Sequence, residues 1–551
     1  MTNEKRVSSK NDKWKRVVLI IVIGIVFLLL AYFLNVITTG ESINSLKLSL
    51  KSSCDPKLFG AKGDGISDET LAIQQAMDTC KIVSFSKGIY KVSALVINHH
   101  NLQLKGNDVA SLVAMDNQNL LYGVDKAQIR ISGISFFGSN LSTIDGDGQA
   151  IYLKNVKDVI ITKNRFSNFK GAGVVRIEGG SSTASDPVTW SEQINITSNI
   201  FVNNTQRAPF APGVAANSIY LVGGVRNFFV LNNRIDAANQ RSGIAMMSNI
   251  RNGKVSQNYL SNIGINDMVQ TYGIFLYDLG ESICKDVEIS SNVIVNVSKM
   301  CIYIQTKGNG GNIFIKNNQL ANCDIHADDS TLPAGAISIN EGRLVFVEGN
   351  RIYGVNENSR GIQILSSIDD SSSVIEGNNI AGGSERHAGT VGIKIAYGSG
   401  IKIKNNTIDN VMLGIGWTQP IEDSVSSFII SNITIVSNKI NNTDKGIGFQ
   451  IYVSPSSGVG SLNISQNKIM NSNIGINTYL LFNSAIISNR ISEARTAEGV
   501  GKAIFIQNGQ RNKILNNIIG QCDYGIYQEV APGVNAVAGN IFSECSVEIF
   551  P

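Results

Sequence analysis

The sequence predicts an all-β protein, a single-stranded parallel β-helix (solenoid), from two observations. Residues 391–417 contain three short runs in which apolar and polar residues alternate, and they return to the starting pattern after 22 residues. In addition, an Asn-x-apolar triplet recurs fourteen times along the chain, at spacings of 22 to 35 residues. Repeats of this length that bury an apolar face only against their neighbours are typical of a solenoid, so we expect about one coil per repeat.

The repeated Asn marks one corner of each predicted coil. Asn tolerates left-handed backbone geometry, and Asn amides stacked on successive coils can hydrogen-bond to one another. We therefore assign these residues to the scaffold rather than to a functional site. They are Asn164, Asn199, Asn233, Asn258, Asn292, Asn318, Asn350, Asn378, Asn406, Asn438, Asn467, Asn489, Asn517 and Asn540.

Three segments are predicted before the β-helix. Residues 1–16 form a basic tail that holds six Lys or Arg and two acidic residues, and so carries the whole formal charge of +4. Residues 17–37 are uncharged and apolar, and at about 1.5 Å per residue they can cross a hydrocarbon core of roughly 30 Å. Residues 38–53 read as a linker to a β-helix domain at residues 54–551.

The basic flank of the apolar run predicts its orientation. By the positive-inside rule the tail lies in the cytoplasm, so we expect a single-pass signal anchor in the cell membrane and an extracytoplasmic β-helix, in a bacterial periplasm or at the cell surface. A cleaved signal peptide is the alternative. The run is, however, longer than the usual apolar core of about 7–15 residues in such peptides.

Charge and cysteine content set further limits. Outside the tail the acidic and basic residues balance, so there is no electrostatic reason to expect a nucleic-acid partner. Cys522 and Cys545 follow equivalent Asn corners and should stack within disulfide reach, while Cys54 and Cys80 flank the first element and could pair. No Cys-x-x-Cys occurs, so no structural zinc site is expected. The remaining cysteines, interpreted as buried free thiols, are Cys284, Cys301 and Cys323.

Residues 59–90 differ from the repeats. Ser67 or Asp68 can N-cap a short helix, and residues 81–85 read as a strand. Such a helix would cover the end of the solenoid. Its expected apolar stripe consists of Leu71, Ile73, Ala76 and Met77.

The same stretch carries a family motif. Residues 59–68 read Phe-Gly-Ala-Lys-Gly-Asp-Gly-Ile-Ser-Asp, followed by Ala72-Ile73, Gly88 and Tyr90, and this resembles the opening of the pectate-lyase-like superfamily. Ser86 stands where that superfamily usually has Pro. The resemblance implies a right-handed parallel β-helix that acts on a polysaccharide. Because the motif is shared by lyases, glycoside hydrolases, epimerase-like proteins and phage tailspikes, it does not decide the reaction.

Outward-facing residues on the Gly/Ala-Ile strand of each coil should form two ladders along one face. An exposed aromatic strip of Tyr220, Phe275, Tyr277 and Tyr303 would suit a glycan, because sugars stack on aromatic rings. The alternative is that loops cover these rings. The first ladder is Tyr220, Ala245, Phe275, Tyr303, Ser338, Gln363, Lys394 and Gly416, and the second is Val222, Met247, Tyr277, Gln305, Asn340, Leu365 and Ala396. The expected substrate-binding residues are Tyr220, Arg241, Phe275, Tyr303, Gln305, Asn340 and Arg360.

Two chemistries fit the candidate catalytic residues. Asp278 and Glu341 follow equivalent strands two coils apart, roughly 10 Å, which is near the upper end of the spacing of about 6.5–9.5 Å in inverting hydrolases. A lyase or epimerase acting on a uronic acid instead needs a base or acid and a cation that pairs with the substrate carboxylate. The candidate catalytic residues are Tyr277, Asp278, Lys307, His326, Glu341 and Arg343, with Arg343 or Arg360 as the cation.

Known catalytic sets do not transfer to this chain. The Gly-His-Gly and Arg-Ile-Lys of polygalacturonase-like hydrolases are absent, and where alginate-epimerase-like proteins carry Asp-Pro-His-Asp this chain reads Phe275-Leu276-Tyr277-Asp278. No cofactor is required by the pattern. Asp145 with Asp147, or Asp328 with Asp329, could contribute oxygen ligands to a Ca²⁺ site.

The leading expectation is lyase or C5-epimerase action on an acidic (uronate) envelope polysaccharide or exopolysaccharide. Glycoside hydrolysis is the enzymatic alternative, and a non-catalytic glycan-binding or adhesive rod is the alternative from another class. Expected partners are the polysaccharide, the membrane through residues 17–37, and either polysaccharide export machinery or further copies of the chain. The last coil has no evident closing helix, so we expect its unpaired edge to be blunted by Pro551 and the tail or to be covered by another chain.

Overall fold

The computed structural model describes most of the chain. Within the described residues, Ser52–Pro551 forms one compact unit, and no helix there is long and apolar enough to cross a membrane. The predicted tail and signal anchor lie outside the described residues. The residues that the structure describes are 51–116, 118–139, 148–180, 189–205, 216–237, 240–265, 271–279, 282–306, 310–324, 335–365, 372–383, 388–418, 430–450, 459–529 and 534–550.

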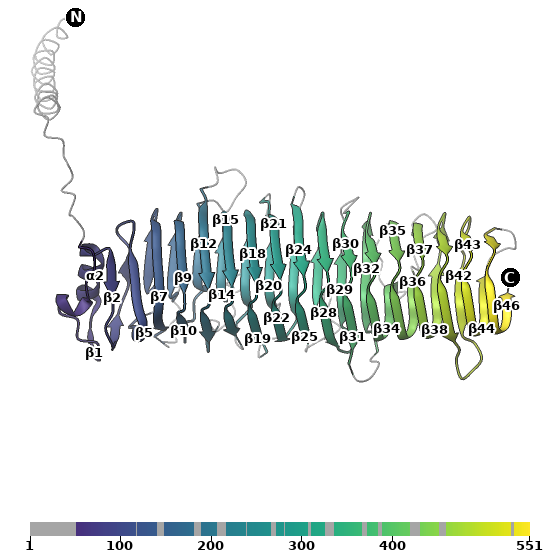
Figure 1. Cartoon of the computed structure of the whole chain (residues 1–551), viewed down its shortest axis with the longest axis horizontal. Coiled ribbons are helices and arrows are strands. Elements are labelled where there is room, and N and C mark those ends of the chain that lie inside the picture. Colours follow the sequence, from purple (N-terminus) through teal and green to yellow (C-terminus); the bar gives the residue numbers. More distant parts are fainter. Residues whose placement is uncertain are drawn as a thin grey trace, which may run out of the picture. The chain divides into compact units, whose positions relative to one another are not determined.

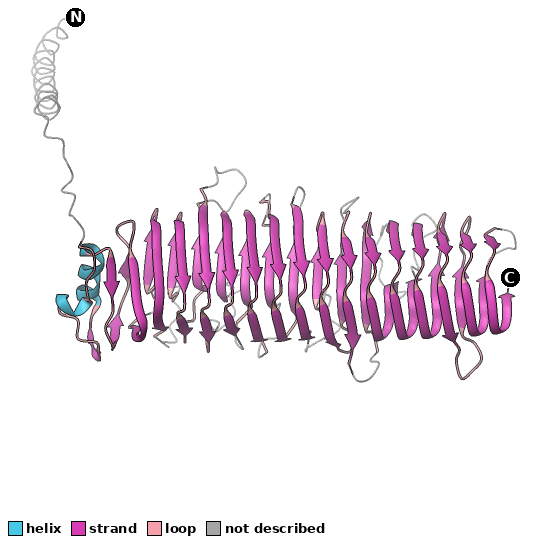
Figure 2. Ribbon diagram, viewed as in Figure 1, coloured by secondary structure: helices cyan, strands magenta, loops and turns pink. Residues whose placement is uncertain are grey.

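The compact unit is a parallel β-helix, in which every coil contributes strands to three stacks (Figure 1; Figure 2). Stack A contains β4 (Leu95–Val96), β6 (Leu121–Val124), β8 (Ile151–Lys154), β11 (Gly173–Glu178), β14 (Asn217–Val222), β17 (Ser242–Met247), β20 (Tyr272–Tyr277), β23 (Met300–Gln305), β26 (Ile337–Asn340), β29 (Arg360–Leu365), β32 (Val391–Ser399) and β42 (Lys502–Gln507). Stack B contains β2 (Ile82–Ser84), β9 (Lys157–Thr162), β12 (Ser191–Thr197), β15 (Val225–Leu231), β18 (Ile250–Ser256), β21 (Lys285–Ser290), β24 (Gly311–Lys316), β27 (Val345–Glu348), β30 (Val374–Glu376), β33 (Lys402–Lys404), β35 (Ile430–Val436), β37 (Val459–Ser465), β39 (Leu481–Phe482), β40 (Ala485–Ile487), β43 (Lys513–Leu515) and β45 (Ala536–Ala538).

Stack C completes each coil, and several strands turn a corner between stacks. Stack C contains β1 (Asp64–Asp68), β3 (Gly88–Val92), β10 (Arg165–Ser167), β13 (Ile200–Val202), β16 (Arg234–Asp236), β19 (Tyr259–Ile263), β22 (Val293–Val297), β25 (Gln319–Cys323), β28 (Arg351–Val355), β31 (Asn379–Gly382) and β41 (Arg490–Ala494). β5 (Gln103–Ala114) and β7 (Ala127–Phe137) turn from stack B into C, whereas β34 (Thr407–Thr418), β36 (Lys439–Gln450), β38 (Lys468–Tyr479), β44 (Ile518–Glu529) and β46 (Ile541–Phe550) turn from C into A. Inward side chains of the three stacks make one continuous apolar core.

The Asn ladder occupies the corner between stacks B and C, and its scaffold role is confirmed. Asn318 is typical: its backbone N–H and its Nδ2 both donate to Oδ1 of Asn350 at 2.9 Å, and Nδ2 also donates to the carbonyl of Ile289. The expectation that the ladder Asn itself is left-handed is wrong. The positive φ belongs to the preceding residue, for example +54° at Asn317, because the turn is completed before the ladder Asn enters the stack.

The first end of the β-helix is covered, as expected, by a helix that follows the short 3-10 helix η1 (Pro56–Phe59) (Figure 2). Helix α2 (Thr70–Thr79) buries Ile73, Ala76 and Met77. Leu71 is 80% exposed, so its place in the predicted stripe is wrong: the helix begins at Thr70, which turns this residue away from the core. Glu69 is the N-cap, although Asp68 still accepts a hydrogen bond from the Thr70 N–H.

At the other end of the β-helix, β46 is the last strand that the structure describes. β46 pairs only with β44 among the described strands. Ile549 continues the inward column of Ile526 yet is 48% exposed, because no further described coil covers it. The disulfide between Cys522 and Cys545 joins β46 to the preceding coil.

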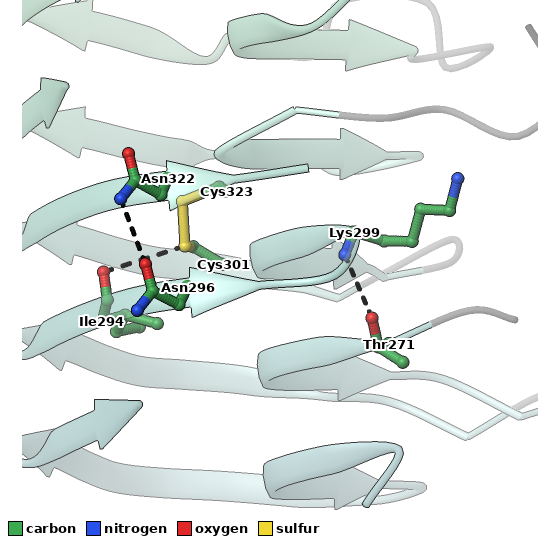
Figure 3. The surroundings of a disulfide bond; sticks show 7 residues. All are labelled: Thr271, Ile294, Asn296, Lys299, Cys301, Asn322 and Cys323. Carbon is green, nitrogen blue, oxygen red and sulfur yellow. Dashed lines mark hydrogen bonds between the residues drawn. A yellow bond between two sulfur atoms is a disulfide. The ribbon is translucent and has the colours of Figure 1, made fainter. Parts of the chain in front are cut away.

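Disulfides join three places in the fold. The expected pairs Cys54–Cys80 and Cys522–Cys545 are both present, and Cys284 is a buried free thiol as expected. The interpretation of Cys301 and Cys323 as free thiols is wrong, because they form a disulfide with a Cα–Cα distance of 5.5 Å (Figure 3). Cys301 is the second residue of β23 in stack A and Cys323 is the last residue of β25 in stack C, so the two meet at the corner between these stacks.

Candidate functional site

The register of stack A confirms the first predicted ladder. Tyr220, Ala245, Phe275, Tyr303, Ser338, Gln363, Lys394 and Gly416 pair in this order on successive coils. The second ladder is confirmed at the paired positions from Val222 to Gln305, and Asn340 pairs with Leu365. The prediction that Ala396 faces outward is wrong, because a register shift after Ile364 pairs Leu365 with Tyr397 and leaves Ala396 in the core.

Aromatic side chains on the outward face of stack A form a cluster of their own, separate from the interior core. Tyr272, Phe275 and Tyr303 pack together, with ring centroids 4.5 Å apart for Tyr272–Phe275 and 5.5 Å for Phe275–Tyr303. Tyr277 lies on Phe275 at 5.5 Å, and Tyr220 packs at the margin, where its hydroxyl donates to Met247 Sδ. The predicted residues are therefore brought together.

The expectation of an exposed strip is wrong for the centre of this cluster. Phe275 is 8% and Tyr303 7% exposed, whereas Tyr220 and Tyr277 are partly exposed. Stacking of the rings on one another removes the central pair from solvent. Burial accordingly raises the pKa of Tyr303 and of Tyr272, so both phenols stay protonated at neutral pH. The buried rings form a rigid base, and Tyr277 is the partly exposed ring above it.

A small polar network adjoins this base. The Tyr303 hydroxyl donates to Oε1 of Gln305 at 2.7 Å and accepts from Nδ2 of Asn340 at 3.1 Å. Gln305 and Asn340 are partly exposed. Their amide groups therefore present donors and acceptors next to the ring of Tyr277, in fixed positions.

The two candidate acids do not share a surface. Backbone hydrogen bonds place Asp278, Thr306 and Glu341 at equivalent turns on successive coils. The N–H of Asp278 donates to the carbonyl of Gln305, and the N–H of Thr306 donates to the carbonyl of Glu341. Asp278 is nonetheless fully buried and lies against Cys284, whose thiol pKa is raised by burial and then by this carboxylate. Glu341 is partly exposed on a left-handed turn. Of the predicted hydrolase pair, Glu341 is therefore accessible and Asp278 is buried.

The other predicted charges are spread along the face. Arg241 lies 5.8 Å from the ring centroid of Tyr272, at one margin of the aromatic cluster. Arg343 is exposed after the β26 turn, and Arg360 is partly exposed at the start of β29. Lys307 and His326 lie outside the described residues.

Some residues at this face were missed by the sequence prediction. Tyr272 is the largest omission, since it belongs to the centre of the aromatic cluster. Extending both ladders one coil towards the N-terminus would have found Arg176 and Glu178, which pair in register with Tyr220 and Val222. Glu178 bonds with Arg176, with Lys154 and with the hydroxyl of Tyr152. Although burial alone raises its pKa, these partners hold the pKa of Glu178 below its usual value.

A metal site is not evident in the described ranges, where no three His, Cys, Asp or Glu side chains are grouped as ligands. The four Asp residues named for Ca²⁺ lie outside those ranges.

Comparison with known families agrees with this architecture. Residues 57–291 match the family described as rhamnogalacturonase A/epimerase, pectate lyase-like. Residues 242–417 and 304–479 match the right handed beta helix region. The chain belongs to the pectate lyase-like right-handed β-helix superfamily. Membership in this superfamily confirms the resemblance seen in the opening motif.

Similar proteins of this superfamily fold come from phages and bacteria. The tail spike protein of Escherichia virus K5 is 32% identical over 117 residues, 21% of this chain, and the match spans 18% of that protein's length. The tailspike of E. coli bacteriophage HK620, solved in complex with a pentasaccharide, is 12% identical over 79% of each chain, with a TM-score of 0.49. The A-module of the Azotobacter vinelandii mannuronan C-5 epimerase AlgE6 is 12% identical over 89% of this chain and 98% of that chain, with a TM-score of 0.23.

Proposed function

We propose that the protein binds an acidic polysaccharide along the outward face of stack A and modifies its uronate residues by lyase or C5-epimerase chemistry. The observation that carries this proposal is the partly exposed ring of Tyr277 beside the fixed amides of Gln305 and Asn340. A ring for stacking next to oriented neutral donors and acceptors is what a sugar requires. The match of residues 57–291 to the family described as rhamnogalacturonase A/epimerase, pectate lyase-like, supports it.

The proposed chemistry begins with removal of the C5 proton of a uronate. A base takes the proton while a cation paired with the carboxylate stabilises the developing negative charge. In a lyase the electron pair then forms the C4–C5 double bond and the bond from C4 to the glycosidic oxygen breaks. In an epimerase a proton returns to C5 from the opposite face. We assign the proton transfers to Tyr277, Lys307 or His326, and the carboxylate to Arg343 or Arg360.

A panel of acidic polysaccharides tests this reaction. A lyase produces an unsaturated sugar that absorbs in the ultraviolet, whereas an epimerase changes the C5 configuration that NMR detects without chain cleavage. Tyr277→Phe, Lys307→Ala and Arg360→Gln should each lower the rate at least 10-fold if the named group acts in the transition state. Glu341→Gln serves as the comparison for hydrolysis. Full activity in the first three variants, and in His326→Ala and Arg343→Gln, would show that the site is misplaced.

Non-catalytic glycan binding is the second candidate function, and one observation favours it over hydrolysis. The carboxylate of Asp278 is enclosed in the structure, so the described residues offer no accessible acid pair at the predicted place. A binder would retain polysaccharide in affinity electrophoresis and yield neither unsaturated products nor new reducing ends. Loss of retention in Tyr277→Ala would locate that binding on stack A.

We further propose that residues 17–37 anchor the chain in the cell membrane, with the β-helix outside the cytoplasm, where it meets polysaccharide during export or remodelling. Three disulfides support an oxidising compartment. The full chain should remain in the membrane fraction after alkaline extraction, and external protease should reach the β-helix in intact spheroplasts. Release of the full chain by alkali would contradict an integral anchor.

A further inference from the structure

In the first outward ladder, the aromatic residues are followed directly by three polar residues. Ser338, Gln363 and Lys394 follow Tyr303 on the next three coils, each step being about 4.8 Å. Ser338 is fully buried and Gln363 is 1% exposed, although both occupy outward positions of stack A. Lys394 is partly exposed, so the column reaches solvent at this end.

The buried polar atoms of this column have no partners. Among the described residues neither Oγ of Ser338 nor Nε2 of Gln363 finds a hydrogen-bond partner. An unpartnered buried polar group costs about 1–3 kcal/mol, and native folds hold few of them. The amide nitrogen is only a donor, and the hydroxyl can donate in any direction its rotation allows. The two groups therefore call for an acceptor that the described chain does not supply.

The charge beside these donors has the matching sign. The described ion pairs include none made by Lys394. Burial, and then the positive charge of Arg360, lower the pKa of Lys394 to about 8, so its ammonium group remains largely protonated at neutral pH. Two buried donors and an ammonium group at successive positions of one column suit an oxyanion.

We propose that Ser338, Gln363 and Lys394 bind one oxyanion group of the ligand, a carboxylate or a sulfate ester carried by the glycan. This inference rests on the proposed function, since it places an acidic substituent of the glycan that lies on Tyr277 and Asn340. The hydroxyl of Ser338 and the amide of Gln363 donate to the anion, and the ammonium of Lys394 pairs with it from the solvent side. The site selects charged over neutral polymers.

Calorimetric titration of the full chain in detergent tests this selection. The probes are polygalacturonate, its fully methyl-esterified form, dextran sulfate and dextran. The wild-type protein should bind at least one charged polymer 10-fold or more tightly than its neutral counterpart. Lys394→Met and Gln363→Leu should remove that preference while the neutral polymer binds as before. Lys402→Met, the same change on the exposed stack B strand of the same coil, should leave the preference intact.

A stability measurement separates binding from a purely structural role. Gln363→Leu removes an unpartnered amide from a buried position, so it should leave the unfolding midpoint unchanged or raise it while weakening anion binding. Loss of both fold and binding in this variant would contradict the inference. Lys394→Arg should restore part of the preference lost in Lys394→Met.

The possible failures are distinguishable. If Lys394→Met and Gln363→Leu keep the wild-type preference, the anion site is wrong while polysaccharide binding stands. If no polymer binds the wild-type chain, the proposed function fails, and Lys394 is then followed by NMR of ¹³C-dimethylated lysines with galacturonate and with sulfate. A shift of its signal with galacturonate, sulfate or both supports the site and identifies the source of the oxyanion. No shift with either anion overturns the inference.

Discussion

At the residue scale, one amino acid can be either a scaffold element or a functional group, and its environment decides which. The side-chain amide of Asn318 is hydrogen-bonded to neighbouring coils, whereas that of Asn340, on the outward face, donates to Tyr303 and keeps part of its surface in solvent. The pattern Asn-x-apolar marks the first kind reliably, because the ladder requires it on every coil. Nothing in the local sequence marks the second kind, since the need for Asn340 arises from a tyrosine one coil away.

Asn318→Ala should destabilise the β-helix by about 3 kcal/mol. The change removes donors to Ile289 and Asn350 and leaves the donors of Asn292 without their buried acceptor. Chemical denaturation followed by circular dichroism measures the loss. Asn463→Ala is the matched control, because Asn463 is exposed on stack B and should change stability by less than about 0.5 kcal/mol. Equal effects of the two variants would contradict the role of the ladder.

Glu178→Gln should lower stability by about 1–2 kcal/mol near neutral pH, because Arg176 and Lys154 lose their carboxylate partner. The pKa of Glu178 is lower in the folded chain than its ordinary value of 4.5. Its carboxylate therefore stabilises the fold above pH 4.5, and this contribution is lost as pH falls through the folded-state pKa.

Denaturation curves of wild type and Glu178→Gln at several pH values measure this dependence. The difference between the two proteins should shrink steadily below pH 4.5. Glu498→Gln, at an exposed position, should follow the wild type throughout. A difference that grows in acid would contradict the sign of the pKa shift.

At the element scale, the corner between stacks C and A explains the main errors of prediction. Strict alternation along β20 places Phe275 and Tyr277 outward, and both positions are correct. At the corner, however, Gly273 and Ile274 both face inward, and a side chain on Gly273 would meet the carbonyl of Cys301 at 2.5 Å. Alternation therefore fails between Gly273 and Ile274, so Tyr272 faces outward and could not be found by a period of two. Cys301 and Cys323 meet at the same corner.

The double variant Cys301→Ala/Cys323→Ala should cost about 3 kcal/mol, the loop-closure value for a loop of 22 residues. Hydrogen exchange should rise mainly in β23 and β25, which the disulfide joins. Cys284→Ala removes a buried thiol but no cross-link, so exchange in those strands should stay slow. Mass spectrometry of the alkylated protein checks that the wild type holds three disulfides.

If the hydrogen-exchange rates of β23 and β25 are the same in the double variant as in Cys284→Ala, the cross-link does not stabilise this corner.

At the scale of the whole compact unit, the β-helix has unequal ends. Helix α2 covers the first coils, while the last coil leaves Ile549 half exposed and β46 with one free edge among the described strands. In a solenoid each repeat contacts only its neighbours, so stability is a sum of local terms. The end without a covering element has fewer of them, and the disulfide between Cys522 and Cys545 is the cross-link that holds it.

Unfolding should therefore start at the C-terminal coils. In mild denaturant, hydrogen exchange of β42, β44 and β46 should become fast before that of β7, β9 and β12. Cys545→Ala should widen this gap because it releases β46 from β44. Simultaneous loss of protection at both ends, in the wild type and in the variant, would contradict unfolding from the C-terminal coils.

The sequence by itself determined the β-helix, the Asn corners, the covering helix and the order of residues along the outward ladders. The β-helix, its corners and its ladders depend on local periodicity, which each coil repeats and which stacking cannot change without breaking the core, while the covering helix follows from an apolar pattern of its own. Only the tertiary structure decided which ladder residues are accessible, that Asp278 is enclosed, that Tyr272 joins the aromatic cluster and that Ser338 and Gln363 are buried without partners. Accessibility depends on side chains from coils 22 to 35 residues apart in the sequence, and these contacts leave no periodic trace in any one coil.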